Sequence, residues 1–578
     1  MPHDPMNPLI VQSDGTVLLE VQNPRYEEAR DRLARFAEVV KSPEYVHTYR
    51  ITPLSLWNAA AAGVSPEEIF DALESLSKYD VPGNVREDVR DHIARYGRLK
   101  LIREDDRLLL LSRDELLLTE ICSQREMQQV LVQRLSPHAV VVSPEARGQV
   151  KQRLVRLGWP VEDLAGYTPG APLDVELRTE ALSGRPFALR DYQQDAVSIF
   201  HAGGAARGGS GVIVMPCGAG KTMVGMGVMA AVKSWSLIIS ANTVAVRQWI
   251  DELVDRTNLT PDLIGEYTGE RKEVRPVTIT TYQCMTWRPT KKSDFPHLNL
   301  MTGHDWGLII YDEVHLLPAP VFRATSDIQA RRRLGLTATL VREDGREGDV
   351  FALIGPKKHD VPWKNLEQKG WIARAVCHEL RIPMPRAARV EYSVASRALQ
   401  YRLAAENPAK MGVLLHLVDQ HRGDRVLIIG QYLGQVEAIA KTVKAPLITG
   451  HTPTRERQRL YDLFRRGEIA LLVVSKVANF AIDLPDANVA IQVSGTFGSR
   501  QEEAQRLGRI LRPKTDGGQA TFYTLVSKDT RDQEFSANRQ LFLTEQGYQY
   551  VIRTAGDGRQ GIVERGQGTG DGNGESRA

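Results

Sequence analysis

Residues 212–222 read VIVMPCGAGKT, an apolar strand that runs into a glycine-containing turn and then into the start of a helix. In such a turn, backbone N–H groups at the helix start bind phosphate, because the helix dipole favours negative charge there. Lys221 is predicted to reach the β- and γ-phosphates of a nucleotide, and the Thr222 hydroxyl to hold Mg²⁺. Met215 replaces the first glycine of the usual GxxxxGK[ST] pattern. Taken alone, the stretch therefore leaves open a helix start that reads GKT by chance.

A second stretch, residues 306–315, reads WGLIIYDEVH and places Asp312 and Glu313 directly after an apolar strand. The carboxyl ends of parallel strands face one crevice, so both acids are expected opposite the phosphate loop. Mg²⁺ binds few protein ligands and keeps several waters, which suits Asp312 as its anchor, and Glu313 is then predicted to be the base for the attacking water. Acidic pairs at strand ends are usually helix caps; the phosphate loop ahead of this pair favours catalysis.

A third stretch, residues 499–512, reads SRQEEAQRLGRILR. Ser499 and Glu502 have the spacing of a capping box, which predicts a helix start. A row of arginines on a helix is normally a solvated face. Presented across a lobe interface, however, Arg509 and Arg512 would neutralise charge on the transferring γ-phosphoryl group. Hydrolysis would then require the lobes to close.

Around these motifs, short apolar strands alternate with helical segments, which is typical of a parallel, doubly wound sheet. The pattern begins near residue 185 and repeats after Trp363, so we predict an α/β fold with two tandem lobes preceded by smaller α+β domains. The expected divisions are a winged-helix-like N-terminal domain, a small α+β domain that ends in a Gly/Pro-rich linker, the two lobes, and a Gly-rich disordered tail: 1–105, 106–180, 181–365, 366–552 and 553–578.

Composition limits the possible binding partners, metal sites and location of the protein. The 74 Lys and Arg against 71 Asp and Glu give a net charge of +3, so any nucleic-acid binding must come from local basic stripes. The 4 cysteines are far apart and form no CxxC pair, which disfavours a local zinc or iron–sulfur site and suits a reducing cytosol. The N-terminus lacks a secretion signal, and no apolar run approaches the ~20 residues of a membrane span. A cytoplasmic protein is predicted.

The three motifs in this order resemble superfamily-two helicases. LRDYQ at 189–193 resembles their adenine-recognition element, and GLTATLVRED at 335–344 resembles their coupling motif, with Thr337, Ala338 and Thr339 at its centre. With IGEYTGERKEVRPVTITTYQ at 264–283 and the stretch at 475–514, the chain resembles the XPB family of DNA helicases in its bacterial form. The resemblance reaches to about residue 552.

This resemblance implies two RecA-like lobes and a DNA-stimulated ATPase that moves 3′-to-5′ and unwinds duplex DNA in repair. It implies ATP and Mg²⁺ as cofactors and forked or distorted duplex and single-stranded DNA as partners. Prokaryotic relatives have a nuclease partner, which extends to this chain by analogy. No membrane is implied, and the expected location is the bacterial cytoplasm, at the nucleoid. A small thumb-like insertion of the family would fall within 390–420.

The resemblance also implies particular site residues. Those around the nucleotide are Arg190, Gln193 (the base reader), Pro216, Cys217, Gly218, Ala219, Gly220, Lys221, Thr222 and Asp483, with Thr222 and Asp312 at the metal. Those that sense the γ-phosphate are Gln505, Arg509 and Arg512. Those on DNA are Arg247, Thr280 and Thr281 in the first lobe, Gly430 and Gln431 in the second, and the strand-separating triplet Arg342, Glu343 and Asp344. Ala481 stands where the family usually has a glycine ahead of Asp483.

The sequence also allows two other functions. One is a duplex translocase that remodels DNA without processive unwinding, and the other is a scaffold with an inactive motor. Intact Lys221, Glu313 and Arg512 argue against the scaffold.

Overall fold

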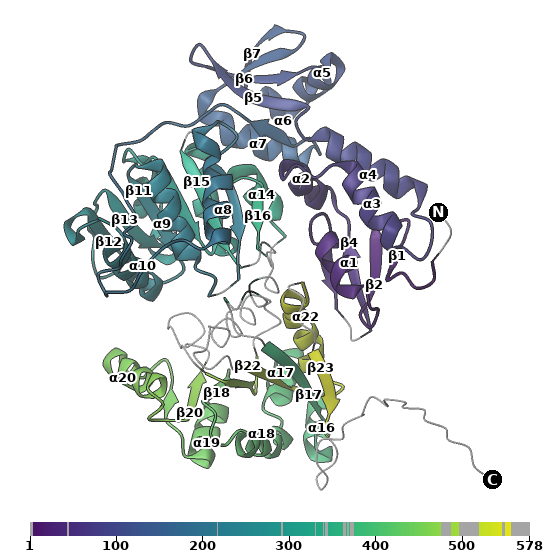
Figure 1. Ribbon diagram of the computed structural model, residues 1–578, viewed down its shortest axis with the longest axis vertical. Helices are drawn as coiled ribbons and strands as arrows, with labels where there is room; N and C mark the ends of the chain where they lie inside the picture. Colours follow the sequence, from purple (N-terminus) through teal and green to yellow (C-terminus); the bar gives the residue numbers. More distant parts are fainter. Residues whose placement is uncertain are drawn as a thin grey trace.

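The computed structural model describes residues 4–42, 45–216, 218–290, 293–329, 331–338, 340, 345–361, 366, 369, 371, 375–475, 487–495, 520–545 and 550–555. Two small units of mixed helix and strand precede two lobes, each of which is built on a seven-stranded sheet. Figure 1 shows the second small unit above the first lobe, the N-terminal unit at its side, and the second lobe below. The predicted fold class is confirmed.

The N-terminal unit combines an antiparallel sheet of order β1-β2-β4-β3 with helices. Its elements are β1 (Leu9–Val11), β2 (Thr16–Glu20), α1 (Tyr26–Leu33), β3 (Glu38–Lys41), β4 (Val46–Arg50), α2 (Pro53–Ala61), α3 (Pro66–Leu76) and α4 (Gly83–Arg95). Thr52 and Ser65 cap α2 and α3, and a proline begins each of these helices. Sheet and helices share one apolar core.

The second unit begins with the strands that were expected to complete a winged-helix-like domain. It has a sheet of order β7-β8-β6-β5-β9. Its elements are β5 (Leu99–Glu104), β6 (Arg107–Ser112), α5 (Glu115–Ser123), α6 (Arg125–Gln128), β7 (Leu131–Ser136), β8 (Ala139–Val142), α7 (Arg147–Arg156) and β9 (Val161–Asp163). The β5–β6 hairpin turns at Asp105 and Asp106, so a boundary after residue 105 would cut this hairpin. The first unit ends with α4.

The second unit is fixed to the first lobe by buried charges. Asp163 accepts hydrogen bonds from Arg147 at 2.7 Å and from Lys151 at 3.1 Å, and all three side chains are less than a tenth exposed. Burial alone would raise the pKa of Asp163, but Lys151 and Arg147 hold it below its ordinary value. Lys151 also donates to Gln329 Oε1 at 2.8 Å, which carries the network into the lobe.

Asp163→Asn is expected to lower the free energy of unfolding by ~3–5 kcal/mol, because it leaves two buried cations without their carboxylate. Chemical denaturation measures the change. The matched control is Asp305→Asn, which breaks a pair with Arg331 whose carboxylate is 63% exposed and should cost ~0–1 kcal/mol. Equal, small losses in both variants would show that the buried network does not hold the two parts together.

The segment predicted to be a linker, Leu164–Asp174, is instead packed along the first lobe. Ala171 O accepts from Trp235 N at 2.8 Å, and Leu173 N donates to Lys233 O at 3.1 Å. At Gly170, where φ is 74°, the backbone comes so close to Gly307 that a Cβ would collide. The glycine here serves close packing of two backbones, so the segment predicted to be a linker is packed against the first lobe.

The first lobe has a parallel sheet of order β12-β13-β11-β14-β15-β10-β16. Its strands are β10 (Ser210–Val214), β11 (Ser236–Ser240), β12 (Ile264–Tyr267), β13 (Val277–Thr281), β14 (Leu308–Asp312), β15 (Arg332–Thr337) and β16 (Lys357–Asp360). Its helices are α8 (Asp191–His201), α9 (Lys221–Val232), α10 (Thr243–Arg256), α11 (Tyr282–Met285), α12 (Asn299–Thr302), α13 (Ala319–Asp327) and α14 (Glu347–Leu353). The central strands are buried on both faces, as their continuous apolar sequences predict.

The second lobe repeats the plan with the order β19-β20-β18-β21-β22-β17-β23. Its strands are β17 (Ala375–Ile382), β18 (Val426–Gly430), β19 (Leu447–Ile448), β20 (Leu471–Ser475), β21 (Val489–Gln492), β22 (Ala520–Ser527) and β23 (Tyr550–Thr554). Its helices are α16 (Arg386–Val394), α17 (Arg397–Ala405), α18 (Ala409–Gln420), α19 (Leu433–Val443), α20 (Thr454–Arg465) and α22 (Arg531–Glu545). Helices α16 to α18 occupy the stretch in which a thumb-like insertion was expected. The predicted tail lies, from residue 556, outside the described residues.

Within the part of the chain that the structure describes, no helix has the length and apolar character needed to cross a membrane.

Candidate nucleotide and DNA site

The phosphate loop connects the buried strand β10 to helix α9. Gly218 and Gly220 have φ values of 82° and 83°, which favour glycine. A Cβ on Gly220 would lie 2.5 Å from Gln193 Nε2. Met215, which replaces the usual first glycine, is fully buried, and its N–H donates to Thr337 O at 2.9 Å. The loop therefore tolerates methionine there and still opens the N-terminus of α9 toward an anion.

The acidic pair lies across the same edge of the sheet. Asp312 ends β14, and its Oδ2 accepts hydrogen bonds from Ser240 Oγ and Trp249 Nε1, both at 3.0 Å. Glu313 has a φ of 54°, a conformation that non-glycine residues rarely adopt outside functional or strained sites. Its Oε1 lies 3.1 Å from Lys221 Nζ. Lysine and glutamate, 92 positions apart by subtraction of their numbers, thus meet as the parallel topology predicts.

The residues at this edge fit a hard cation. Burial, followed by the neighbouring charge of Glu313, raises the pKa of Asp312, and Lys221 and the two hydrogen bonds only partly offset this. A cation beside Asp312 would relieve this unfavourable environment of the carboxylate. The described residues hold no group of three His, Cys, Asp or Glu side chains that could bind a metal by themselves. Mg²⁺ needs only one or two protein ligands, because nucleotide phosphates and water complete its coordination.

His315 connects the acidic turn to the coupling motif, and the sequence analysis did not single it out. Its Nδ1 lies 2.7 Å from Thr337 Oγ1 at the end of β15 and 3.5 Å from Glu313 Oε2. The ring is buried, so its contacts are protected from water. The sequence signal that could have identified His315 is its position two residues after Glu313, in the same turn.

The predicted adenine-recognition residues lie beside the loop. Gln193 Oε1 accepts from Arg190 N and its Nε2 donates to Ala219 O, both at 2.9 Å. Tyr192 OH donates to the same carbonyl at 2.9 Å. Gln193 is buried and braces the loop in this structure, while the Arg190 guanidinium lies 4.2 Å from the ring centroid of Trp371. Trp371 is an aromatic neighbour that the sequence analysis missed.

The predicted DNA residues of the first lobe differ in accessibility. Arg247 on α10 is 48% exposed and forms an ion pair of 2.6 Å with Glu270. Thr280 and Thr281 are buried at the end of β13. Thr281 Oγ1 accepts from Cys284 N at 3.0 Å and so caps α11. The Thr281 side chain therefore fixes the start of α11, and of the three residues Arg247 presents an exposed cation.

In the second lobe, Gly430 ends β18 and Gln431 follows it. A Cβ on Gly430 would meet Val436 Cγ1 at 2.5 Å. Gln431 N donates to Ser494 Oγ at 2.8 Å. The turn is therefore tied to the chain just beyond β21.

Of the other predicted site residues, Pro216 lies in the phosphate loop and Thr222 in the first turn of α9. The following lie outside the described residues: Cys217, Thr339, Arg342, Glu343, Asp344, Asp483, Gln505, Arg509 and Arg512.

Two parallel-sheet lobes in tandem, with a phosphate loop opposite an acidic pair in the first, define the helicase class of motor proteins. Three family models match: ERCC3/RAD25/XPB C-terminal helicase over residues 366–564, type III restriction enzyme, res subunit over 186–342, and helicase conserved C-terminal domain over 9–136.

Curated relatives cover nearly the whole chain. A DNA 3'-5' helicase XPB of Kineococcus radiotolerans is 55% identical over 96% of this chain and 98% of its own length. A DNA 3'-5' helicase XPB of Mycobacterium tuberculosis is 54% identical over 95% of this chain and 98% of its own. The general transcription and DNA repair factor IIH helicase/translocase subunit XPB/SSL2 of Saccharomyces cerevisiae is 32% identical over 96% of this chain and 73% of its own. The chain belongs to the XPB family of helicases.

Proposed function

We propose that this protein is an ATP-dependent DNA helicase, a DNA-stimulated ATPase that moves 3′-to-5′ and unwinds duplex DNA in repair. The observation that carries the proposal is the 3.1 Å contact between Lys221 and Glu313 at the edge of the first lobe's sheet. Family membership over nearly the full chain supports the DNA substrate and the polarity.

Hydrolysis is proposed to proceed through the first lobe's own groups. The N–H groups from Gly218 to Thr222 bind the phosphates, and Lys221 moves from Glu313 to the β- and γ-phosphates when ATP enters. Glu313 is then released to accept a proton from the attacking water. Thr222 and Asp312 would hold Mg²⁺, which supplies positive charge to the phosphates when bound.

Coupling is proposed to run through His315. The ring contacts Thr337 Oγ1, so a change at the acidic turn is transmitted directly to the coupling motif. In the second lobe, Arg509 and Arg512, with Gln505, sense the γ-phosphate, and Asp483 lies between ATP and DNA. Arg190 and Gln193 contact the base, Gln193 after leaving its contacts with the loop.

DNA is proposed to cross both lobes along its phosphate backbone, which positions the strand without reading its sequence. Arg247 in the first lobe and the backbone of Gly430–Gln431 in the second contact the strand, and the triplet 342–344 separates strands. Thr280 and Thr281, whose side chains are buried, would act through the backbone at the end of β13.

The proposed substrates are forked or distorted duplexes and single strands. A nuclease partner is proposed by analogy with prokaryotic relatives. Action on chromosomal DNA would place the protein in the bacterial cytoplasm, at the nucleoid.

A duplex translocase without processive unwinding remains the second candidate, because one relative is described as a helicase/translocase subunit. Strand displacement on a fork distinguishes a helicase from that translocase, which would displace a triplex strand instead.

ATP hydrolysis with and without DNA tests the proposal. We expect single-stranded or forked DNA to raise kcat, because bound DNA favours the closed lobes that bring Arg512 to the phosphate. RNA of the same length and charge is the matched control for a purely electrostatic effect. Absent hydrolysis would point to a scaffold with an inactive motor, and hydrolysis that DNA leaves unchanged would contradict a DNA-stimulated ATPase.

A further inference from the structure

A buried ion pair lies in the second lobe, away from the nucleotide site. Lys410 of α18 and Asp532 in the first turn of α22 meet at 2.8 Å between Nζ and Oδ2. Their side chains are 2% and 0% exposed. A buried pair of this kind contributes little net stability, because removing two charges from water costs about as much as their attraction returns. The pair is therefore more important for the positions of the segments that it joins than for net stability.

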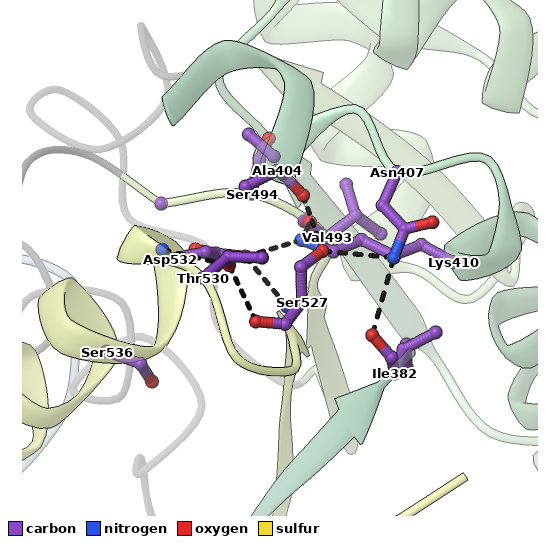
Figure 2. Close-up of polar contacts among 12 residues, drawn as sticks. Ile382, Ala404, Asn407, Lys410, Val493, Ser494, Ser527, Thr530, Asp532 and Ser536 are labelled. Carbon is purple, nitrogen blue, oxygen red and sulfur yellow. Dashed lines mark hydrogen bonds and ion pairs between the residues drawn. The ribbon is translucent and has the colours of Figure 1, made fainter. Parts of the chain in front are cut away.

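Each member of the pair also binds the backbone. Lys410 Nζ donates to Val493 O at 3.0 Å, and Asp532 Oδ2 accepts from Ser527 N at 3.1 Å. Val493 follows β21, and Ser527 ends the neighbouring strand β22. Figure 2 shows the two charged side chains meeting beside these residues. One ion pair thus fixes the carboxyl ends of two adjacent strands.

The next two residues after Val493 are held as well. Ser494 Oγ accepts from Gln431 N at 2.8 Å and donates to Gln435 Oε1 at 2.7 Å. Gly495 O accepts a hydrogen bond from Tyr401 OH. A Cβ on Gly495 would lie 2.7 Å from the guanidinium carbon of Arg539, so the backbone passes directly against this side chain. Residues 493–495 are therefore held from several sides.

Two functional parts of the lobe are connected to this short segment. The Gly430–Gln431 turn, a proposed DNA contact, is bonded to Ser494. In the other direction, the arginine-rich stretch 499–512 begins four positions after Gly495 (499 minus 495).

We propose that Lys410 and Asp532 are positioning residues, which set residues 493–495 and, through Ser494, the DNA-contact turn at Gly430–Gln431. The inference rests on the proposed function for its effect on hydrolysis. Neither residue touches ATP or DNA. Movement of the segment by ~1 Å would misplace groups that must be aligned for hydrolysis, at a cost of up to ~100-fold in rate.

The substitution Lys410→Met tests this proposal. It leaves no buried carboxylate without a cation, because Arg539 Nη2 lies 3.9 Å from Asp532 Oδ1 and both side chains are buried. Asp532 Oδ2 keeps its hydrogen bond from Ser527 N, so the substitution removes the bond to Val493 O and the link between α18 and α22. We expect the thermal unfolding temperature and ATP affinity to stay close to those of the unsubstituted protein, while the DNA-stimulated kcat falls ~10- to 100-fold.

Glu379→Gln is the matched control. Glu379 is also buried, and it accepts from Ser536 Oγ at 2.8 Å and from Gln540, both of α22. Its substitution therefore perturbs the same helix, and within the described part of the chain Glu379 has no hydrogen bond or ion pair with residues 493–495. We expect kcat to be retained in this variant, even if its unfolding temperature falls.

Hydrogen exchange in the full chain gives a readout that does not depend on activity. In Lys410→Met, amide exchange should quicken in peptides that cover 426–436 and 487–495, and nowhere in the first lobe. Unchanged kcat and unchanged exchange in Lys410→Met would overturn the positioning role. Equal losses of kcat in Lys410→Met and in Glu379→Gln would also overturn it. If the unsubstituted protein hydrolyses no ATP, the proposed function fails, and the exchange comparison still decides the role of the pair.

Discussion

Glu313→Gln is expected to bind ATP normally and to hydrolyse it at least ~10²-fold more slowly, the low end for loss of a positioned acid–base group. The amide keeps the shape of the side chain but cannot accept the proton from water. Loss of the ion pair with Lys221 removes a competitor of ATP for this lysine, so affinity should not fall. Single-turnover hydrolysis, together with nucleotide binding at equilibrium, measures both quantities.

Glu273→Gln is the control for this substitution, because Glu273 is an exposed glutamate of the same lobe. It should hydrolyse ATP at the unsubstituted rate. Near-normal turnover in Glu313→Gln would mean that another group accepts the proton, and the assignment of Glu313 as the base would be lost.

Arg512→Ala is expected to lower kcat by ~10³-fold or more, as in nucleotidases that use an arginine in trans. ATP affinity should change much less, because the contact forms fully only when the lobes close on the transition state. The role of Arg512 is inferred from the sequence, because this residue lies outside the described residues. Steady-state kinetics with saturating DNA separates kcat from nucleotide affinity.

Arg466→Ala is a suitable comparison, since Arg466 is a second-lobe arginine that is 62% exposed and forms an ion pair with Glu468 at the surface. Its kcat should match that of the unsubstituted protein. If affinity for ATP fell as far as kcat in Arg512→Ala, this arginine would be a ground-state binding residue and would not couple hydrolysis to closure.

The parts of the fold that could be predicted from sequence are those that a local pattern specifies. Continuous apolar strands such as 212–214 and 308–311 predicted buried parallel sheets, and both lobes have them. Parallel topology then predicted that Lys221 and Glu313 would meet, as they do. In each case one physical rule, burial or strand direction, was enough.

The contacts that the sequence did not predict join residues far apart in the chain. Lys151 binds Gln329, 178 positions away, and no local sequence pattern indicates this contact. The Gly/Pro-rich stretch 164–174 predicted a linker, and only the structure shows that Gly170 within it allows two backbones to touch. Glycine has both uses, and only the packed structure distinguishes them.

In the nucleotide and DNA site, too, some features could not be predicted from the sequence. Resemblance placed Thr280 and Thr281 at the DNA, but the structure buries their side chains, and Thr281 caps a helix. His315 was missed, because its importance comes from Thr337, which lies 22 positions away and next to it only in the folded sheet.

The polarity of unwinding tests the central claim, that hydrolysis at Glu313 drives 3′-to-5′ movement on DNA. Two duplexes of identical sequence are compared, one with a 3′ single-stranded tail and one with a 5′ tail, with ATP and with a non-hydrolysable analogue. The account predicts strand separation only with the 3′ tail and only with ATP, and none by Glu313→Gln on either duplex. Equal separation of both duplexes, or separation with the analogue, would contradict it.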